Sequence, residues 1–396
     1  MKKTFDVVVA GAGIVGLVAA CRLARIERVR VTVLDGGPRP SFDATEDVGL
    51  RVSAIAPGSI AILESLGCWD RIHETRAGAF RAMRVWDARG CADGPEALRF
   101  DAGEFAVPSL GYIVENALIQ DALLADLDSR DASIRFETPI EKLDRDKDRF
   151  TVVTGSGETF AAELLVGADG AHSKMRDEAG ICVRSRPYAQ NAFVTHCRPE
   201  RAHRETAWQR FLESGPIALL PLHDGRVSIV WSTTPAQADD AVEADDDTLS
   251  AMLTDATDAV LGKLDVAGPR GAFPLGAGHA TQYVQPGLAL IGDAAHSIHP
   301  LAGQGANLGI ADANALADVV ARAVADNEYP GDLPTLRRYE RSRRGANELM
   351  LNVVDGLNRL FSNESQWLSA VRGAGMYAFN SSGPIRERVV RVALGL

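Results

Sequence analysis

A glycine-rich turn near the N-terminus constrains the fold of this chain more than any other feature. Gly11, Gly13 and Gly16 form a G-x-G-x-x-G pattern that follows the apolar run at 5–10 and precedes an alanine-rich segment of helical character. A second apolar run occupies 29–35. This succession predicts a strand, a tight turn, a helix and a second, parallel strand, which together form a βαβ unit of the Rossmann type.

Each part of this turn has a role in binding a dinucleotide. The first glycine allows the tight turn, the second lets the backbone approach a pyrophosphate, and the third permits close packing of helix on strand. The N-terminus of the helix expected at 14–25 offers free N–H groups to phosphates. Asp35 ends the second strand, where a carboxylate is expected to bind ribose hydroxyls. The pattern predicts a dinucleotide ligand without deciding between NAD and FAD.

The composition excludes some classes of function. The chain has 396 residues and a formal net charge of −11 at pH 7, so we expect no nucleic-acid partner. Its length favours two packed domains. Five cysteines without a C-x-x-C pair indicate reduced thiols and a cytoplasmic protein. No apolar stretch reaches the roughly 20 residues that a membrane-spanning helix needs.

The rest of the chain shows two kinds of strand. The runs at 163–170 and 288–296 end in Gly/Asp turns, which is typical of parallel strands that deliver loops to one edge of a sheet. The run at 216–233 contains an Asp-Gly dipeptide, which predicts a hairpin. We expect this hairpin and the run at 80–90 to be antiparallel, and the pattern from about 332 onward to be helical.

The segment at 292–312 admits two interpretations. Asp293, His296 and His299 recur at intervals of three and could ligate a metal. Pro300 and the glycines after it interrupt the helix that would place them on one face. We therefore expect no metal site, and we interpret both histidines as structural hydrogen-bonding groups.

The same segment is better explained as a cofactor loop. Gly292 and Asp293 end a strand, so the carboxylate can accept hydrogen bonds from the hydroxyls of a sugar alcohol. Gly303, Gln304 and Gly305 let bare backbone lie against a flat ligand, and a helix follows. The N-terminus of that helix would stabilise negative charge on the ligand.

These motifs make the sequence recognisable. It resembles the class A FAD-dependent aromatic hydroxylases and, among them, the ubiquinone-biosynthesis (UbiH-like) hydroxylases, over essentially the whole chain. The matching stretches, in the family's order, lie at 11–16, 51–59, 111–123, 167–176 and 292–312.

The resemblance implies an α/β fold like that of p-hydroxybenzoate hydroxylase. A Rossmann-like FAD-binding domain is interleaved with an antiparallel-sheet substrate domain, and helices complete the C-terminus. The ranges that we expect are 1–75, 101–182 and 275–335 for the FAD-binding domain, 76–100 and 183–274 for the substrate domain, and 336–396 for the C-terminal helices.

The resemblance also implies the cofactor and its contacts. FAD is expected to bind noncovalently, with Arg51 and Asn116 in contact with it and Asp169 in a D-G motif that serves both FAD and NADPH. Motifs and resemblance together predict these cofactor-binding residues: Gly11, Gly13, Gly16, Asp35, Arg51, Asn116, Asp169, Gly170, Arg176, Gly292, Asp293, Pro300, Gly303, Gln304, Gly305 and Asn307. We assign no catalytic side chain.

The implied reaction is hydroxylation of the aromatic ring of a polyprenylated phenol in ubiquinone biosynthesis. NAD(P)H would reduce the flavin, which would add O2 and transfer one oxygen atom from a C4a-hydroperoxide. A second glycine fingerprint is absent, which favours transient binding of NAD(P)H. Three alternatives stay open, namely hydroxylation of a small soluble aromatic compound, reduction of the double bonds of a prenyl chain without consumption of O2, and a non-catalytic flavin-binding scaffold in a biosynthetic complex. A halogenase is disfavoured because no two tryptophans lie two residues apart.

The last segment, PIRERVVRVALGL at 384–396, combines arginines with apolar residues. Such a segment could rest on anionic lipid at the inner membrane face. The alternative is a helix that packs on the protein's own core or in a subunit interface.

Overall fold

A mostly parallel sheet forms one half of the protein. The computed structural model describes residues 3–130, 132–146, 149–298, 304–361, 379–380 and 382–396. The strand order of this sheet is β18-β19-β12-β1-β2-β8, and all neighbours pair in parallel except β18 and β19. The bounds are β1 Phe5–Ala10, β2 Val29–Leu34, β8 Ser133–Arg135, β12 Leu164–Gly167, β18 Val284–Gln285 and β19 Leu288–Leu290. The predicted parallel strands are confirmed.

Helices and a small three-stranded sheet bury this sheet, because Phe150, Val152 and Ala162 of the small sheet belong to the same core as the helices, and this burial explains why the strands are apolar throughout. Helix α1 (Ile14–Leu23) packs against α4 (Asn116–Asp128) and α8 (Gln304–Ala325). Leu17 and Val18 of α1 have no exposed surface. The predicted βαβ unit therefore forms the centre of the larger core.

A second, eight-stranded sheet has the order β20-β17-β13-β16-β15-β14-β5-β6. The predicted hairpin at 216–233 is confirmed, with Gly225 at φ +86° in its turn. The run at 80–90 is only partly antiparallel, because its strand pairs in parallel with β14. The bounds are β5 Ala82–Asp87, β6 Leu98–Asp101, β13 Val183–Pro199, β14 Thr206–Leu212, β15 Gly215–Pro221, β16 Val227–Thr233, β17 Leu264–Ala280 and β20 His296–Ser297.

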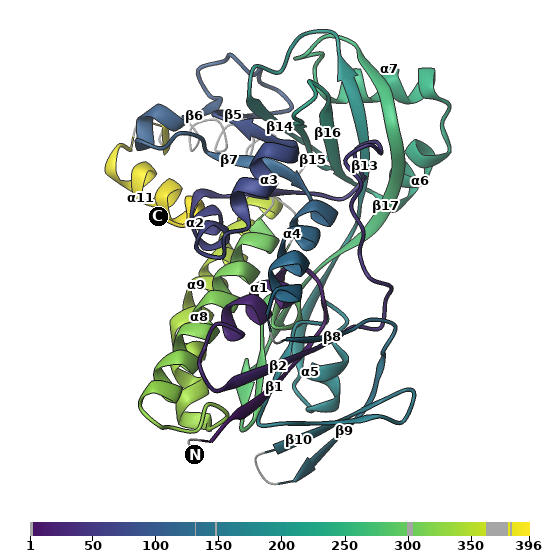
Figure 1. Cartoon of the computed structure of the whole chain (residues 1–396). Helices are drawn as coiled ribbons and strands as arrows, with labels where there is room; N and C mark the ends of the chain where they lie inside the picture. Colours follow the sequence, from purple (N-terminus) through teal and green to yellow (C-terminus); the bar gives the residue numbers. More distant parts are fainter. Residues whose placement is uncertain (1–2, 131, 147–148, 299–303, 362–378, 381) are drawn as a thin grey trace.

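The two sheets are joined by the longest strands. In Figure 1, β13 and β17 run from the upper sheet down toward the parallel sheet, and β20 pairs with the lower end of β17. Helices α6 (Pro235–Glu243) and α7 (Asp246–Ala256) cover one face of the upper sheet. Their side chains form a core with Phe193, Ile229 and Trp231.

The remaining strands form two small three-stranded sheets. The order β3-β7-β4 places Val52–Ile55 beside Gly111–Glu115 and Ala77–Phe80, and the helices α2 (Pro57–Ser65) and α3 (Trp69–Arg76) follow β3. The order β11-β10-β9 joins Thr159–Ala162, Arg149–Thr154 and Ile140–Asp146. A short helix, α5 (Lys174–Glu178), follows β12.

Where the structure describes the C-terminal part of the chain, that part is mainly helical, as predicted. Helix α9 spans Leu333–Phe361 and α11 spans Pro384–Leu394. Val390 and Leu394 of α11 are buried against residues of a 3-10 turn, η1 (Ala102–Phe105). None of the described helices is long and apolar enough to span a bilayer.

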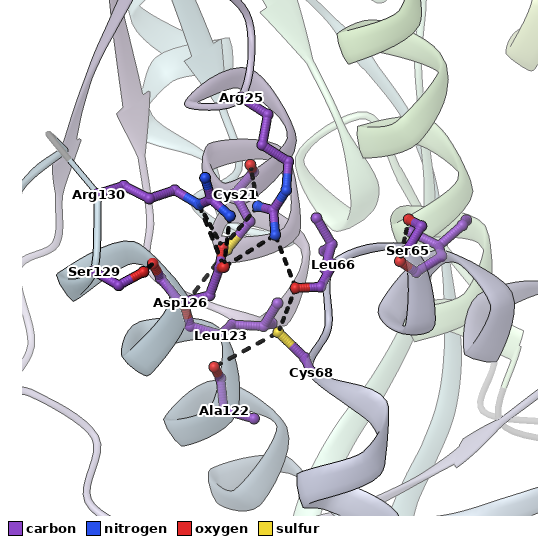
Figure 2. Close-up of polar contacts among 11 residues, drawn as sticks. Cys21, Arg25, Ser65, Leu66, Cys68, Ala122, Leu123, Asp126, Ser129 and Arg130 are labelled. Atoms are coloured by element: carbon purple, nitrogen blue, oxygen red, sulfur yellow. Dashed lines mark hydrogen bonds and ion pairs between the residues drawn. The ribbon is translucent and has the colours of Figure 1, made fainter.

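A polar cluster fastens α1 to its neighbours (Figure 2). Both arginines, Arg25 and Arg130, donate to the carboxylate of Asp126. The thiols of Cys21 and Cys68 donate to carbonyl oxygens of α4, and burial raises the pKa of Cys21 and raises that of Cys68 to about 11. All five cysteines of the chain are free. The protonated thiol of Cys21 therefore links α1 to α4, and that of Cys68 links the segment before α3 to α4.

Candidate functional site

The three glycines of the turn are needed for different reasons, two for the packing of the protein and one for the space beside it. Gly11 has φ +106°, and a Cβ there would overlap the carbonyl oxygen of Ala168. A Cβ on Gly16 would overlap the carbonyl oxygen of Gly11. At Gly13 a Cβ would meet no protein atom within 4 Å. The packing of the protein therefore requires the outer two glycines, whereas the middle one faces open space at the N-terminus of α1.

Asp35 lies beside this turn, as expected. Its carboxylate accepts hydrogen bonds from the backbone N–H groups of Ala12 (2.6 Å) and Gly37 (2.7 Å). Gln120 of α4 closes the same turn by donating to the carbonyl oxygen of Ala12 at 3.0 Å. The sequence reasoning missed Gln120, although its position one helical turn after Asn116 places both side chains on one face of α4.

Arg51 and Asn116 are brought together at the edge of the small β3-β7-β4 sheet. The backbone N–H of Asn116 donates to the carbonyl oxygen of Arg51 at 3.0 Å. The side-chain oxygen of Asn116 accepts from Ser53 at 2.7 Å. The Arg51 side chain is exposed, so its charge is available to an anionic ligand.

Asp169 and Arg176 organise the loop after β12. The Asp169 carboxylate accepts from the hydroxyl of Ser173 and from the backbone N–H of Met175, and Gly170 has φ +84°. Arg176 is buried and donates to the carbonyl oxygen of Ala294 at 3.3 Å. Arg176 therefore ties this loop to the 3-10 turn η2 (Gly292–Ala294).

Asp293 lies in η2 and is close enough to His296 and Arg51 to interact with their charges. The protein packed around its carboxylate raises the pKa of Asp293, and the charges of His296 and Arg51 lower it by less. The residue nevertheless keeps an exposed surface. Because Asp293 keeps an exposed surface, the hydroxyls of a ligand can reach its carboxylate.

A buried carboxylate that the sequence reasoning missed supports this loop. Asp312 of α8 accepts from His296 Nε2 (2.5 Å), Arg343 Nε (2.7 Å), Asn347 Nδ2 (3.0 Å) and the backbone N–H of Gly292 (3.2 Å). Burial alone would raise the pKa of Asp312, but His296 and Arg343 together hold it below its ordinary value. The network links η2, β20, α8 and α9.

This network defines the role of His296. Its ring is buried and bound to Asp312, which agrees with a structural hydrogen-bonding group. Among the residues that the structure describes, no three His, Cys, Asp or Glu side chains are grouped to hold a metal ion. His299, Pro300 and Gly303 lie outside the described residues.

The start of α8 differs from the expected loop. The helix begins at Gln304, so Gln304 and Gly305 form its first turn instead of a loop that precedes it, because glycine and glutamine do not prevent helical backbone at an N-terminus. Asn307 is buried, donates to the carbonyl oxygen of Ala54 (2.7 Å) and accepts from the N–H of Ala56 (2.9 Å). It fixes β3 to α8.

The described elements thus converge on one region, formed by the N-termini of α1 and α8, the Asp169 loop, η2 and Arg51. Comparison with known proteins agrees with this arrangement. The family model described as an FAD binding domain matches residues 4–352. The chain belongs to this family of FAD-binding flavoproteins.

The curated proteins similar to this chain include several enzymes of ubiquinone biosynthesis. The flavoprotein is 36% identical to the human mitochondrial ubiquinone biosynthesis monooxygenase COQ6, over 98% of this chain and 92% of the relative. It is also 36% identical to the 3-demethoxyubiquinol 3-hydroxylase of Escherichia coli strain K12, over 99% and 98%. The ubiquinone hydroxylase UbiL of Rhodospirillum rubrum is 35% identical, over 99% and 90%.

Solved structures show the same fold. The flavoprotein matches PqsL, a probable FAD-dependent monooxygenase from Pseudomonas aeruginosa, with a TM-score of 0.77, 23% identity, and coverage of 95% of this chain and 100% of that one. It matches Klebsiella pneumoniae HpxO, complexed with FAD and uric acid, with a TM-score of 0.77, 22% identity, and coverage of 99% and 97%. The expected p-hydroxybenzoate hydroxylase-like fold class is confirmed.

Proposed function

We propose that this protein is an FAD-dependent monooxygenase that hydroxylates the aromatic ring of a polyprenylated phenol in ubiquinone biosynthesis, with NAD(P)H and O2 as co-substrates. The observation that carries the proposal is the near full-length similarity to ubiquinone-biosynthesis hydroxylases from human, Escherichia coli and Rhodospirillum rubrum. The described site supplies positions suited to a dinucleotide.

The residues present fit FAD. Open space at Gly13 leaves room for a pyrophosphate at the N-terminus of α1, where backbone N–H groups favour an anion. The cofactor contacts we propose are those named from the sequence, with Gly13, Asp35 and Asn116 toward the nucleotide half and Asp293 toward the ribityl chain. Arg176 and Asn307 act differently, because their hydrogen bonds hold η2 and β3 in place.

When bound, FAD supplies the redox chemistry and the activation of O2. The protein's part is to position the cofactor and substrate and to keep water from the reacting atoms. The N-terminus of α8 would hold the flavin ring and stabilise negative charge on it when it is reduced, and the exposed Arg51 guanidinium would contribute a positive charge to the same site. The Asp312 network holds η2, and thereby Asp293, in a single geometry.

The substrate assignment can be tested by oxygen transfer. We expect purified protein to consume O2 and NAD(P)H in the presence of a polyprenylphenol and to yield a product one oxygen atom heavier, detected by mass spectrometry. Tightly coupled hydroxylation of 4-hydroxybenzoate or salicylate, without turnover of the polyprenylphenol, would favour the small-aromatic alternative. Stoichiometric FAD without phenol-stimulated NAD(P)H oxidation would favour the scaffold.

We also propose cytoplasmic localisation with peripheral contact at the inner membrane face, through α11. Val389, Val392 and Leu396 expose 46%, 55% and 53% of their surface beside the arginines of this helix. An apolar face flanked by cations suits an anionic bilayer surface. Flotation with anionic liposomes should retain the full chain and lose a variant that ends at Gly383. If the full chain and the truncated variant float equally, α11 does not bind the membrane, and any membrane contact is made by another part of the protein.

The two large sheets support the two domains that we propose. The parallel sheet draws its strands from 5–34, 133–135, 164–167 and 284–290, and the eight-stranded sheet draws its strands from 82–101, 183–280 and 296–297. Strand β17 continues past the expected boundary at 275, so the domain boundary lies within a continuous strand.

A further inference from the structure

The segment that leads into Arg51 contains no helix and no strand. It connects β2 to β3, and in Figure 1 this dark purple part of the chain passes beside β13 of the eight-stranded sheet. Without a helix or a ladder, the backbone groups of such a segment need other partners. The shape of the segment near the cofactor site therefore depends on the groups that bind it from outside.

Both backbone groups of Gly49 are held by buried side chains. The N–H donates to Glu115 Oε1 at 2.8 Å, and the carbonyl oxygen accepts from His196 Nε2 at 3.0 Å. Glu115 is 6% exposed, and His196 has no exposed surface. A carbonyl oxygen only accepts, so Nε2 of His196 carries the proton. Because Glu115 ends β7 and His196 lies on β13, Gly49 joins the small β3-β7-β4 sheet to the eight-stranded sheet.

The backbone is also fixed on the far side of Gly49. A Cβ on Gly271 of β17 would lie 3.1 Å from Leu50 Cδ2, so Leu50 lies against the eight-stranded sheet. The carbonyl oxygen of Arg51 accepts from the N–H of Asn116 at 3.0 Å. Three consecutive residues outside any helix or strand are thus each held by another part of the protein.

The Arg51 side chain, by contrast, is not held by the protein. It is exposed, and its guanidinium makes no hydrogen bond or ion pair with any residue that the structure describes. Its charge nevertheless acts on Asp293, so the guanidinium lies near the cofactor site. Because no partner fixes the side chain, the backbone of Gly49–Arg51 determines where it starts and which way it extends.

We propose that His196 is a positioning residue for the cofactor, because it holds the carbonyl oxygen of Gly49 and thereby aims Arg51 at an anionic group of FAD. The inference rests on the proposed function, in which Arg51 contacts FAD. His196 itself does not touch FAD. A charge-assisted hydrogen bond depends on distance and angle, so a shift of the backbone at Gly49 weakens the contact that Arg51 makes.

Thr195 provides a matched control on the same strand. It is fully buried, and its hydroxyl donates to the carbonyl oxygen of Pro269 at 3.1 Å. It pairs with Ile229, which belongs to the core beneath α6 and α7, whereas the next residue, His196, points to the opposite face. Thr195→Val therefore removes the same kind of bond, from a buried side chain to a backbone carbonyl oxygen, without acting on Gly49.

The test measures the FAD that the holoenzyme releases on dilution, detected by its fluorescence. We expect His196→Leu to raise the Kd for FAD about five- to tenfold, the scale of one hydrogen bond. His196→Gln should keep a Kd near the wild-type value, because its amide still donates to Gly49. Thr195→Val should lower the unfolding midpoint and leave the Kd unchanged. If His196→Leu does not fold, His196→Asn replaces it, because the shorter amide does not reach Gly49.

A double-mutant cycle with Arg51→Ala separates positioning from a general loss of structure. Arg51→Ala should raise the Kd about ten- to a hundredfold, because it removes a hydrogen bond from a charged group. In that background His196→Leu should change the Kd by less than about twofold, since no guanidinium is left to aim. The unfolding midpoint should fall equally in both backgrounds.

The other outcomes contradict the assignment of His196. A wild-type Kd in His196→Leu would overturn it, and so would a wild-type Kd in Arg51→Ala, because there would then be no contact to aim. An equal loss of affinity in both backgrounds would show that His196 only supports the fold and would overturn it as well. If wild type hydroxylates no polyprenylphenol, the proposed function fails, while these FAD affinities stay as measured.

Discussion

Replacement of Asp312 by alanine should strongly destabilise the protein. The carboxylate has no exposed surface and accepts hydrogen bonds from Arg343, His296, Asn347 and the N–H of Gly292. Its removal leaves the Arg343 guanidinium, 16% exposed, without its carboxylate. Loss of one partner of a buried ion pair costs about 3–5 kcal/mol.

This cost translates into a measurable midpoint. With an unfolding entropy of about 2.1 cal/mol/K per residue over 396 residues, the loss lowers the midpoint by about 4–6 °C. Circular dichroism melts with saturating FAD would measure it. We also expect weaker FAD binding, because Asp312 holds the turn that carries Asp293.

The control lies on the same helix. Asp318 pairs with Arg22 and is 46% exposed, so Asp318→Asn should shift the midpoint by about 1 °C or less, as surface pairs contribute about 0–1 kcal/mol. Equal midpoints for Asp312→Ala and wild type would refute the reasoning, since a buried carboxylate with four donors would then carry no net stability.

Four further outcomes are expected. Gly13→Val should fold and lose FAD on gel filtration, whereas Gly16→Ala should lower the unfolding midpoint, because only the latter overlaps protein backbone. Asp293→Ala should weaken FAD by about 1–3 kcal/mol, measured by equilibrium titration. Arg226 lowers the pKa of Asp47 from 3.8 to about 2, so the extra stability of wild type over Asp47→Asn should be complete above pH 3.8 and disappear as the pH falls toward 2. EDTA should leave turnover unchanged, and restoration of lost activity by zinc or iron would contradict this.

The parts of the fold that were predicted from sequence depend on local patterns. The strand at Phe5–Ala10 and the helix after it are defined by apolar periodicity and by glycines at fixed spacing, both of which lie within 30 residues. The hairpin at 216–233 is equally local, because its Asp-Gly turn sits between the paired strands. Such features need no knowledge of distant partners.

The parts that could not be predicted depend on distant pairing. The strand at Ala82–Asp87 pairs in parallel with Thr206–Leu212, and nothing in an alternating pattern states the direction of a partner that far along the chain. Gln209 presents the same problem. In Trp208-Gln209-Arg210 either face could have been exposed, and only the register with Ala218 and Val85 shows that Gln209 shares a face of the sheet with apolar side chains.

Asp312 shows why only part of the site could be predicted from the sequence. An aspartate on a helix with an apolar stripe is normally interpreted as a solvent-facing residue. Here it is buried, where it accepts hydrogen bonds from the backbone N–H of Gly292 and from the ring of His296. The buried charge is compensated by Arg343, from a helix that begins more than 20 residues later. Asp293 and His296 therefore have different roles despite their regular spacing. The carboxylate of Asp293 is exposed, whereas the imidazole of His296 is buried against Asp312. A shared metal ion would require both side chains to face the same way.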